Sequence, residues 1–123
     1  MALLTNLLNI PIYLVVIIHI YIVFLEMYLW DTSYGRKAFN LTAQLSADTR
    51  VLAANQGLYN GFLAAGLIWG LYEGGVMGTK IELFFLSCVL VAGVFGACTS
   101  TIKTLYIQTA PAVVAMGVLL VWG

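Results

Sequence analysis

Four long stretches of this sequence contain no charged residue. They cover residues 1–25, 51–72, 83–102 and 104–123. About 20 helical residues cross the roughly 30 Å hydrocarbon core of a bilayer, and a helix satisfies its own backbone hydrogen bonds there. The stretches also lack the period-two alternation of barrel strands. The sequence therefore predicts an all-α fold, an integral membrane four-helix transmembrane bundle that forms a single domain. Its helices are expected at about residues 7–29, 49–72, 80–99 and 104–122.

Composition agrees with a membrane location and excludes several alternatives. The chain is 63% hydrophobic and 8% charged, with zero formal net charge, which argues against a nucleic-acid partner because such proteins need a basic patch. The first stretch differs from a secretory signal, since no basic residue precedes it and no small-residue cleavage site ends it. Cys88 and Cys98 are ten residues apart on one predicted helix, about 15 Å along its axis, so they are too distant for a disulfide.

The basic residues predict an orientation in the membrane. With four spans, the connections at 31–50 and 99–104 lie on one side. That side holds Arg36, Lys37, Arg50 and Lys103, whereas the other holds Lys80. Because excess Lys and Arg mark the cytoplasmic face, both termini are predicted to be extracytoplasmic. A dimer of oppositely oriented copies remains open.

Two connections have recognisable local patterns. In the segment 31–50, Phe39, Leu41 and Leu45 suggest a piece that lies on the membrane surface, and Ser46 is a plausible N-cap for the second helix. In the next connection, Gly74, Gly75 and Gly78 indicate a tight turn.

Polar residues recur at one depth inside the predicted spans. Glu26, Asn55 and Gln108 each lie five residues from the charged residue that marks their helix end, roughly 7 Å inside the cytoplasmic boundary. His19 lies seven residues before Glu26, almost two helical turns, so both should project from one face of the first helix.

The second predicted helix has two distinct faces. At about 100° per residue, one arc carries hydrogen-bonding side chains and a separate stripe carries small ones. The arc consists of Asn55, Gln56, Tyr59 and Asn60, and the stripe of Gly57, Gly61 and Ala65. Small residues let another helix approach closely, and the polar arc should face protein or a water-filled cleft because lipid cannot satisfy it.

Two of these segments also carry a family resemblance. "HIYIVFLEMYLW", with His19, Glu26 and Trp30, followed by "NQGLYNGFLAAGL", resembles the small four-span membrane family catalogued as domain of unknown function 1304. The resemblance extends over essentially the whole chain. It implies a bacterial-type, multi-pass protein of the cell inner membrane whose activity is not established. Some members are labelled epimerases, but this sequence has no nucleotide-binding glycine pattern that would support that chemistry.

The candidate site residues follow from these patterns. His19 and Glu26 are the candidate catalytic pair, because an acidic side chain inside a membrane span is expensive and is a functional candidate by default. Candidate ligand-binding residues are Trp30, Asn55, Gln56, Tyr59, Asn60 and Gln108. Structural roles compete with each of these, including interhelical hydrogen bonds of the carboxamides and pairing of Glu26 with Arg50 or His19. One His and one Glu are not a zinc ligand set, so neither a metal nor another cofactor is expected.

Three function classes fit the sequence. In the first, a polar intramembrane cavity near the cytoplasmic leaflet binds a small amphipathic or lipid-like molecule, with isomerase-like acid/base chemistry as one form of this class. The alternatives are a small dimeric proton-coupled transporter and an accessory subunit that packs against a larger membrane protein. The apolar run 110–122 disfavours a polar pore through one protomer. A homodimer in the lipid bilayer is expected, and whether any reaction is catalysed stays open.

Overall fold

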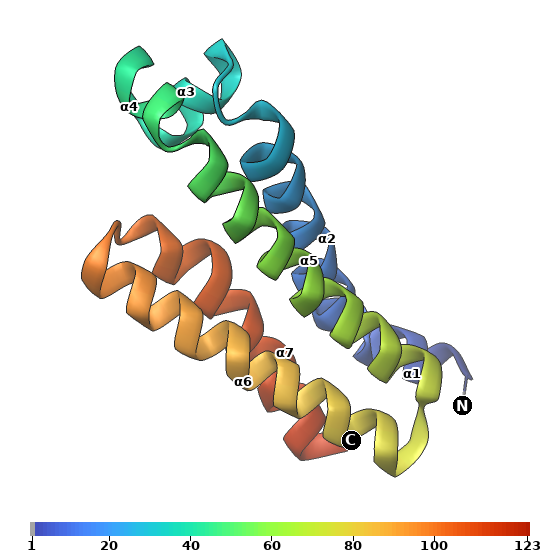
Figure 1. Cartoon of the computed structure of the whole chain (residues 1–123). Helices are drawn as coiled ribbons and strands as arrows, with labels where there is room; N and C mark the ends of the chain where they lie inside the picture. Colours follow the sequence, from blue (N-terminus) through green and yellow to red (C-terminus); the bar gives the residue numbers. More distant parts are fainter. Residues whose placement is uncertain (1) are drawn as a thin grey trace. The chain divides into compact units, whose positions relative to one another are not determined.

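The computed structural model describes residues 2–123, and all regular structure in this range is helical (Figure 1). Helices α1 to α4 cover Ala2–Leu8, Ile10–Phe24, Ser33–Phe39 and Ala43–Asp48, and α5 to α7 cover Arg50–Glu73, Gly75–Thr99 and Ala110–Trp122. Two π-helical segments, η1 (Leu25–Leu29) and η2 (Leu105–Thr109), continue into or out of α-helices. The all-α prediction is confirmed.

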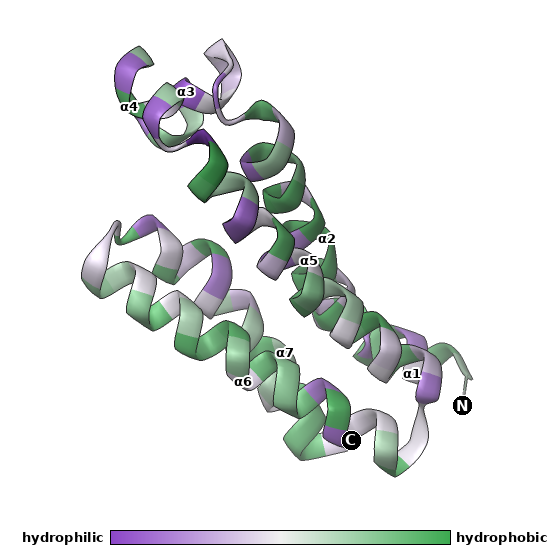
Figure 2. Cartoon of the chain, viewed as in Figure 1, coloured by the Kyte–Doolittle hydropathy of each residue, from purple (hydrophilic) through white to green (hydrophobic). Residues whose placement is uncertain are grey.

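Three helical stretches of the described chain are long and apolar enough to cross a membrane. They are Ile10–Leu29, Gly75–Thr99 and Leu105–Trp122. The second predicted span, residues 49–72, forms as α5, but it does not join this set, so the expected count of four is not matched. Length is not the reason, since its 24 residues extend about 36 Å. Figure 2 shows the reason: hydrophilic residues interrupt the first half of α5, whereas α2 is mostly hydrophobic. The three apolar helices suggest a membrane protein.

The chain divides into two compact units. One comprises Met1–Ile18 with Leu63–Gly123, and the other comprises His19–Phe62. Helices α2 and α5 each contribute residues to both.

The first unit is built around an apolar core in which α6 packs along η2 and α7 (Figure 1). The core residues are Ile12, Val15, Val16, Ala64, Leu67, Leu86, Val89, Ala112, Ala115 and Leu119. Small residues allow the closest approach: a Cβ at Gly93 would collide with Thr109, and one at Gly96 would lie 2.8 Å from Thr104 Cγ2. Gly93 and Gly96 of α6 therefore pack against η2 and the residue that precedes it.

The connection between α5 and α6 is shorter than the sequence suggested. Gly74 and Gly75 have φ angles of +65° and +60°, which only glycine adopts readily, so the predicted turn is confirmed there. The third predicted span, which forms as α6, however begins at Gly75 rather than near residue 80. Gly78 is therefore helical and buried, and Lys80 and Glu82 belong to α6. Helix α6 starts earlier than predicted because Gly74 and Gly75, both with positive φ, reverse the direction of the chain within two residues.

In the second unit, two short helices fold the segment between η1 and α5. Thr32 caps α3 by accepting a hydrogen bond from the Gly35 amide, and Asn40 ends the helix in the left-handed conformation with φ 54°. Thr42 caps α4 by accepting from the Leu45 amide at 3.1 Å. The expectation that Ser46 is an N-cap was wrong, because a separate helix forms there and Ser46 lies buried inside it.

Candidate functional site

Glu26 lies in a local irregularity of the first long helix. It is the second residue of η1, which follows α2 without a break, since Phe24 and Trp30 on either side both have right-handed helical backbone angles. A π-helical turn makes i→i+5 hydrogen bonds, and such single turns inside α-helices occur frequently at functional sites. The acidic residue that the sequence singled out therefore sits on a bulge of its helix.

A hydrogen bond joins Glu26 to the second predicted helix. The Asn60 Nδ2 atom donates to Glu26 Oε1 at 2.6 Å, and it also reaches the Gln56 carbonyl of its own helix at 3.1 Å. Both Glu26 and Asn60 are half-buried. The contact spans 34 positions in sequence, so it ties two separate helices together.

Close helix packing brings these two side chains within reach. A Cβ at Gly57 would lie 2.5 Å from Met27 Cγ and 3.1 Å from Glu26 Cβ, and one at Gly61 would lie 3.6 Å from Val23 Cγ2. These two glycines of the predicted small-residue stripe therefore face the first helix. The expected close approach of another helix to Gly57 and Gly61 is confirmed.

The remaining members of the predicted polar arc do not reach Glu26. Asn55 is exposed, and its Nδ2 atom donates to the Val51 carbonyl of its own helix at 2.9 Å. Gln56 and Tyr59 are also exposed, and the Tyr59 ring lies 6.1 Å from that of Phe62 between centroids. Of the four arc residues, Asn60 alone bonds to the carboxyl among the described residues.

The other candidate residues have different surroundings. His19 is 1% exposed and lies in α2, before η1 begins. Gln108 is half-buried in η2, which belongs to the first unit rather than to the unit of Glu26. Trp30 donates its indole N–H to Thr49 Oγ1 at 2.9 Å, and its ring centroid lies 4.6 Å from that of Phe39. Trp30 therefore fastens the end of the first helix to the segment that leads into α5.

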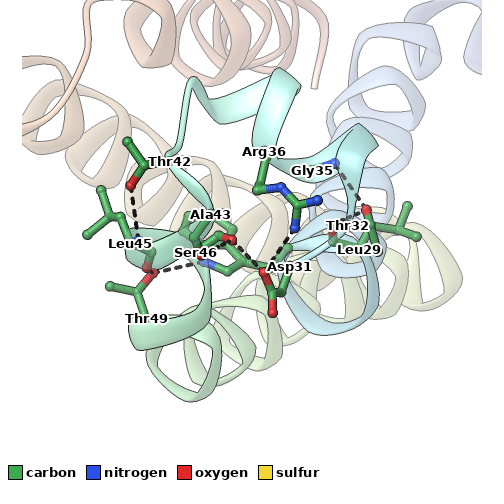
Figure 3. Close-up of polar contacts among 11 residues, drawn as sticks. Leu29, Asp31, Thr32, Gly35, Arg36, Thr42, Ala43, Leu45, Ser46 and Thr49 are labelled. Carbon is green, nitrogen blue, oxygen red and sulfur yellow. Dashed lines mark hydrogen bonds and ion pairs between the residues drawn. The ribbon is translucent and has the colours of Figure 1, made fainter.

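A second polar cluster organises the connection next to this site (Figure 3). Ser46 Oγ donates to Asp31 Oδ1 at 2.5 Å, and Arg36 Nη1 donates to the same oxygen at 3.1 Å. The Ser46 hydroxyl, followed by the Arg36 side chain and the charge of Arg50, lowers the pKa of Asp31 below its usual value, although partial desolvation opposes them. This cluster connects α3 and α4 to the end of the first long helix.

The lowered pKa of Asp31 predicts acid sensitivity. A carboxyl whose pKa is lower in the folded state stabilises that state above its unfolded pKa of about 3.9, and the contribution disappears as pH falls through the folded value. We expect the thermal midpoint of wild type to fall faster below about pH 4 than that of Ser46→Ala, which lacks the largest cause of the shift. Thermal unfolding followed by circular dichroism across this range measures it. Asp48→Asn is the control, and identical acid profiles for wild type and Ser46→Ala would contradict the assignment.

Glu82 is a buried acidic residue that was not among the candidates from the sequence. It immediately precedes the uncharged run 83–102 of the sequence, and the structure places it 5% exposed and two turns inside α6. Glu82 lies seven residues after Gly75, which places it inside the helix. This spacing could be interpreted only after the start of α6 was known. This carboxyl belongs to the first unit and thus to a different environment from Glu26.

Fold and site together show that the regular structure of residues 2–123 is helical, with three helices long and apolar enough to cross a membrane and an acidic residue on a π-helical turn of the first of them. Residues 13–120 match the family described as "Protein of unknown function (DUF1304)", and the chain belongs to this family. It is similar to the "Uncharacterized protein YpaA" of Lactococcus lactis subsp. lactis (strain IL1403), with 28% identity over 98 residues that cover 78% of this chain and 82% of that protein. No solved structure matches.

Proposed function

We propose that this protein is a four-span protein of the inner membrane that binds a small amphipathic or lipid-like molecule beside Glu26. The observation that carries the proposal is the Asn60–Glu26 hydrogen bond between two helices, at a π-helical turn. In this arrangement α5 is the fourth span, since it is long enough and its polar residues are used for binding rather than exposed to lipid. The segment with Arg36 and Lys37 then lies on the cytoplasmic side, and both termini are extracytoplasmic.

The polar chemistry suits a ligand whose head group donates hydrogen bonds. Asn60 occupies Glu26 Oε1, and no described residue donates to Oε2, so one carboxyl oxygen is available to an N–H or O–H group. Gln56 and Tyr59 are exposed next to Asn60 and supply both donors and acceptors. Exposed carboxamides in hydrocarbon are costly unless a polar partner covers them. A ligand head group at this position satisfies them.

The surface around these groups suits an apolar tail. Phe62 is exposed on α5 and its ring contacts that of Tyr59, and Leu52 is exposed two turns before Tyr59 on the same face of the helix. A molecule with a polar head and a hydrocarbon tail therefore finds both kinds of contact along one stretch of chain. Glu26 can also exchange a proton with a bound donor, which is the basis for isomerase-like acid/base chemistry. A homodimer that shields the exposed arc is part of the same proposal.

The test is whether a ligand co-purifies and depends on the Glu26 carboxylate. The protein is purified from membranes in mild detergent and examined by native mass spectrometry for a bound small molecule. Glu26→Gln keeps the shape of the side chain but removes its charge and should lower ligand occupancy roughly tenfold or more, since charge-assisted hydrogen bonds are strong. The matched control is Asp48→Asn, at an exposed acid of the same unit.

Wild-type occupancy in Glu26→Gln would make Glu26 a structural residue and overturn the proposal. If Glu26→Gln does not fold, Gln56→Leu gives the same test, because Gln56 is exposed and its side chain is not needed for packing. Full occupancy in Gln56→Leu, or no bound molecule in wild type, counts against the site.

A further inference from the structure

The first unit contains a pocket that the sequence did not suggest. Its volume is about 220 Å³. Residues from the α1–α2 junction, the α5–α6 turn, the first turns of α6 and the end of α7 line it, among them Asn9, Thr79, Glu82 and Trp122. All of these belong to one compact unit, and Glu26 and Asn60 belong to the other. The pocket is therefore separate from the site proposed above.

Glu82 is the feature that gives this pocket its chemistry. The side chain is 5% exposed and lines the pocket, and no hydrogen bond or ion pair joins its carboxyl group to another described residue. A Cβ on Gly70 would lie 2.5 Å from Glu82 Cγ, so the aliphatic part of the side chain packs against the backbone of α5. Removing a carboxylate from water without a partner is expensive. Such a residue is a candidate for binding a cation.

The rest of the lining favours an organic ammonium ion over a metal ion. Thr79 donates its hydroxyl hydrogen to the Gly75 carbonyl at 3.1 Å, which leaves its oxygen free to accept, and Asn9 adds a carboxamide oxygen. A calcium ion takes six to eight oxygen ligands, whereas the part of the chain that the structure describes has no group of three His, Cys, Asp or Glu side chains that could hold a metal ion. Leu71 and Leu119 form apolar walls, and Trp122 provides an aromatic face that attracts cations.

We propose that this pocket binds a small primary ammonium compound with a short apolar chain, its three N–H donors facing Glu82, Asn9 and Thr79. The volume of about 220 Å³ lies below the range of about 300–1,000 Å³ typical of drug-sized ligands, so the ligand is a small amine rather than a lipid. The carboxylate supplies charge, the two neutral groups supply direction, and the leucines hold the chain. Trp122 contacts the ammonium or the carbons next to it.

The experiment uses n-butylammonium as the probe and n-butanol as its neutral counterpart. Binding to the purified full-length protein is measured by saturation-transfer NMR and by the concentration dependence of the melting midpoint. We expect saturable binding of n-butylammonium, at least roughly tenfold weaker in Glu82→Gln because the charged partner is lost. Glu73→Gln is the matched control, since Glu73 is an exposed acid at the end of α5, and it should bind as wild type does.

Several outcomes overturn the proposal. These are equal binding of n-butanol, unchanged binding in Glu82→Gln, and displacement of the probe by Mg²⁺ or Ca²⁺ well below millimolar concentration. If Glu82→Gln does not fold, Trp122→Leu decides instead, because Trp122 is 63% exposed and its removal spares the core. We expect it to weaken n-butylammonium binding about two- to fivefold through loss of the cation–π contact. Wild-type affinity in that variant also rejects the site.

Discussion

Replacing Gly35 with alanine is expected to destabilise the protein by about 3 kcal/mol or more, which is large for a single added methyl group. Gly35 is buried in α3, and a Cβ at this position would collide with the carbonyl oxygens of Leu29 and Trp30. Both obstacles are backbone atoms at the end of η1, so no side-chain rotation relieves the contact. The better helix propensity of alanine offsets about 1 kcal/mol at most. Helix α3 would have to move away from the end of the first long helix.

Chemical or thermal unfolding of the detergent-solubilised protein measures this effect. A loss of about 3 kcal/mol corresponds to roughly 10 °C in the midpoint for a chain of this size. Gly117→Ala is the control, because Gly117 is exposed in α7 and a Cβ there meets nothing within 4 Å. That change should be neutral or slightly stabilising. A midpoint for Gly35→Ala within a degree of wild type would show that α3 does not pack on the backbone as described.

The sequence predicted the helices well because their signal is local. Runs without charge and with helical length appear directly in the chain, and the predicted ends near residues 49, 72, 104 and 122 agree with α5, η2 and α7 within one residue. Glycine stripes are equally direct, since Gly57 and Gly61 do face the first helix. The start of α6 was harder to predict, because three glycines within residues 74–78 give no indication of which one ends the turn.

Side-chain partners were harder to predict because they depend on the exact rotation of each helix. Counting at a uniform 100° per residue placed four polar side chains of α5 in one arc. Of these four, however, Asn60 alone hydrogen-bonds to Glu26 among the described residues. Glu26 itself lies in η1, where the helical register changes and uniform counting no longer applies. The indole N–H of Trp30, a predicted ligand-binding residue, is bonded to Thr49, a residue 19 positions away. No local pattern encodes that pairing.

The burial of Glu82 illustrates a further limit of sequence reasoning. Charged residues near a span boundary usually reach water, so a glutamate before an uncharged run is read as a boundary marker. Here the close approach of α5 and α6 covers it, and that approach depends on Gly70 and Gly78, whose role is visible only in three dimensions. The same two glycines therefore shape both the helix pair and the pocket beside it.

Gly78→Ala is accordingly expected to have the second large effect. A Cβ at Gly78 would lie 2.5 Å from the Gly70 carbonyl oxygen, so the two helix backbones would have to separate. Overpacking of this kind destabilises by about 1–3 kcal/mol, and the gain in helix propensity offsets up to about 1 kcal/mol. Because Glu82 packs on Gly70, separation of the helices should also displace the carboxyl from its pocket.

Two measurements on Gly78→Ala separate these consequences. The unfolding midpoint should fall relative to Gly117→Ala, which adds the same methyl group to a helix without a neighbour within 4 Å. If n-butylammonium binds wild type, its affinity for Gly78→Ala should also fall severalfold, because the carboxylate no longer lines the pocket together with Asn9 and Thr79. A variant with the stability of wild type would disprove the tight contact between α5 and α6. A destabilised variant with full affinity for the probe would show instead that the pocket does not depend on how closely these two helices pack.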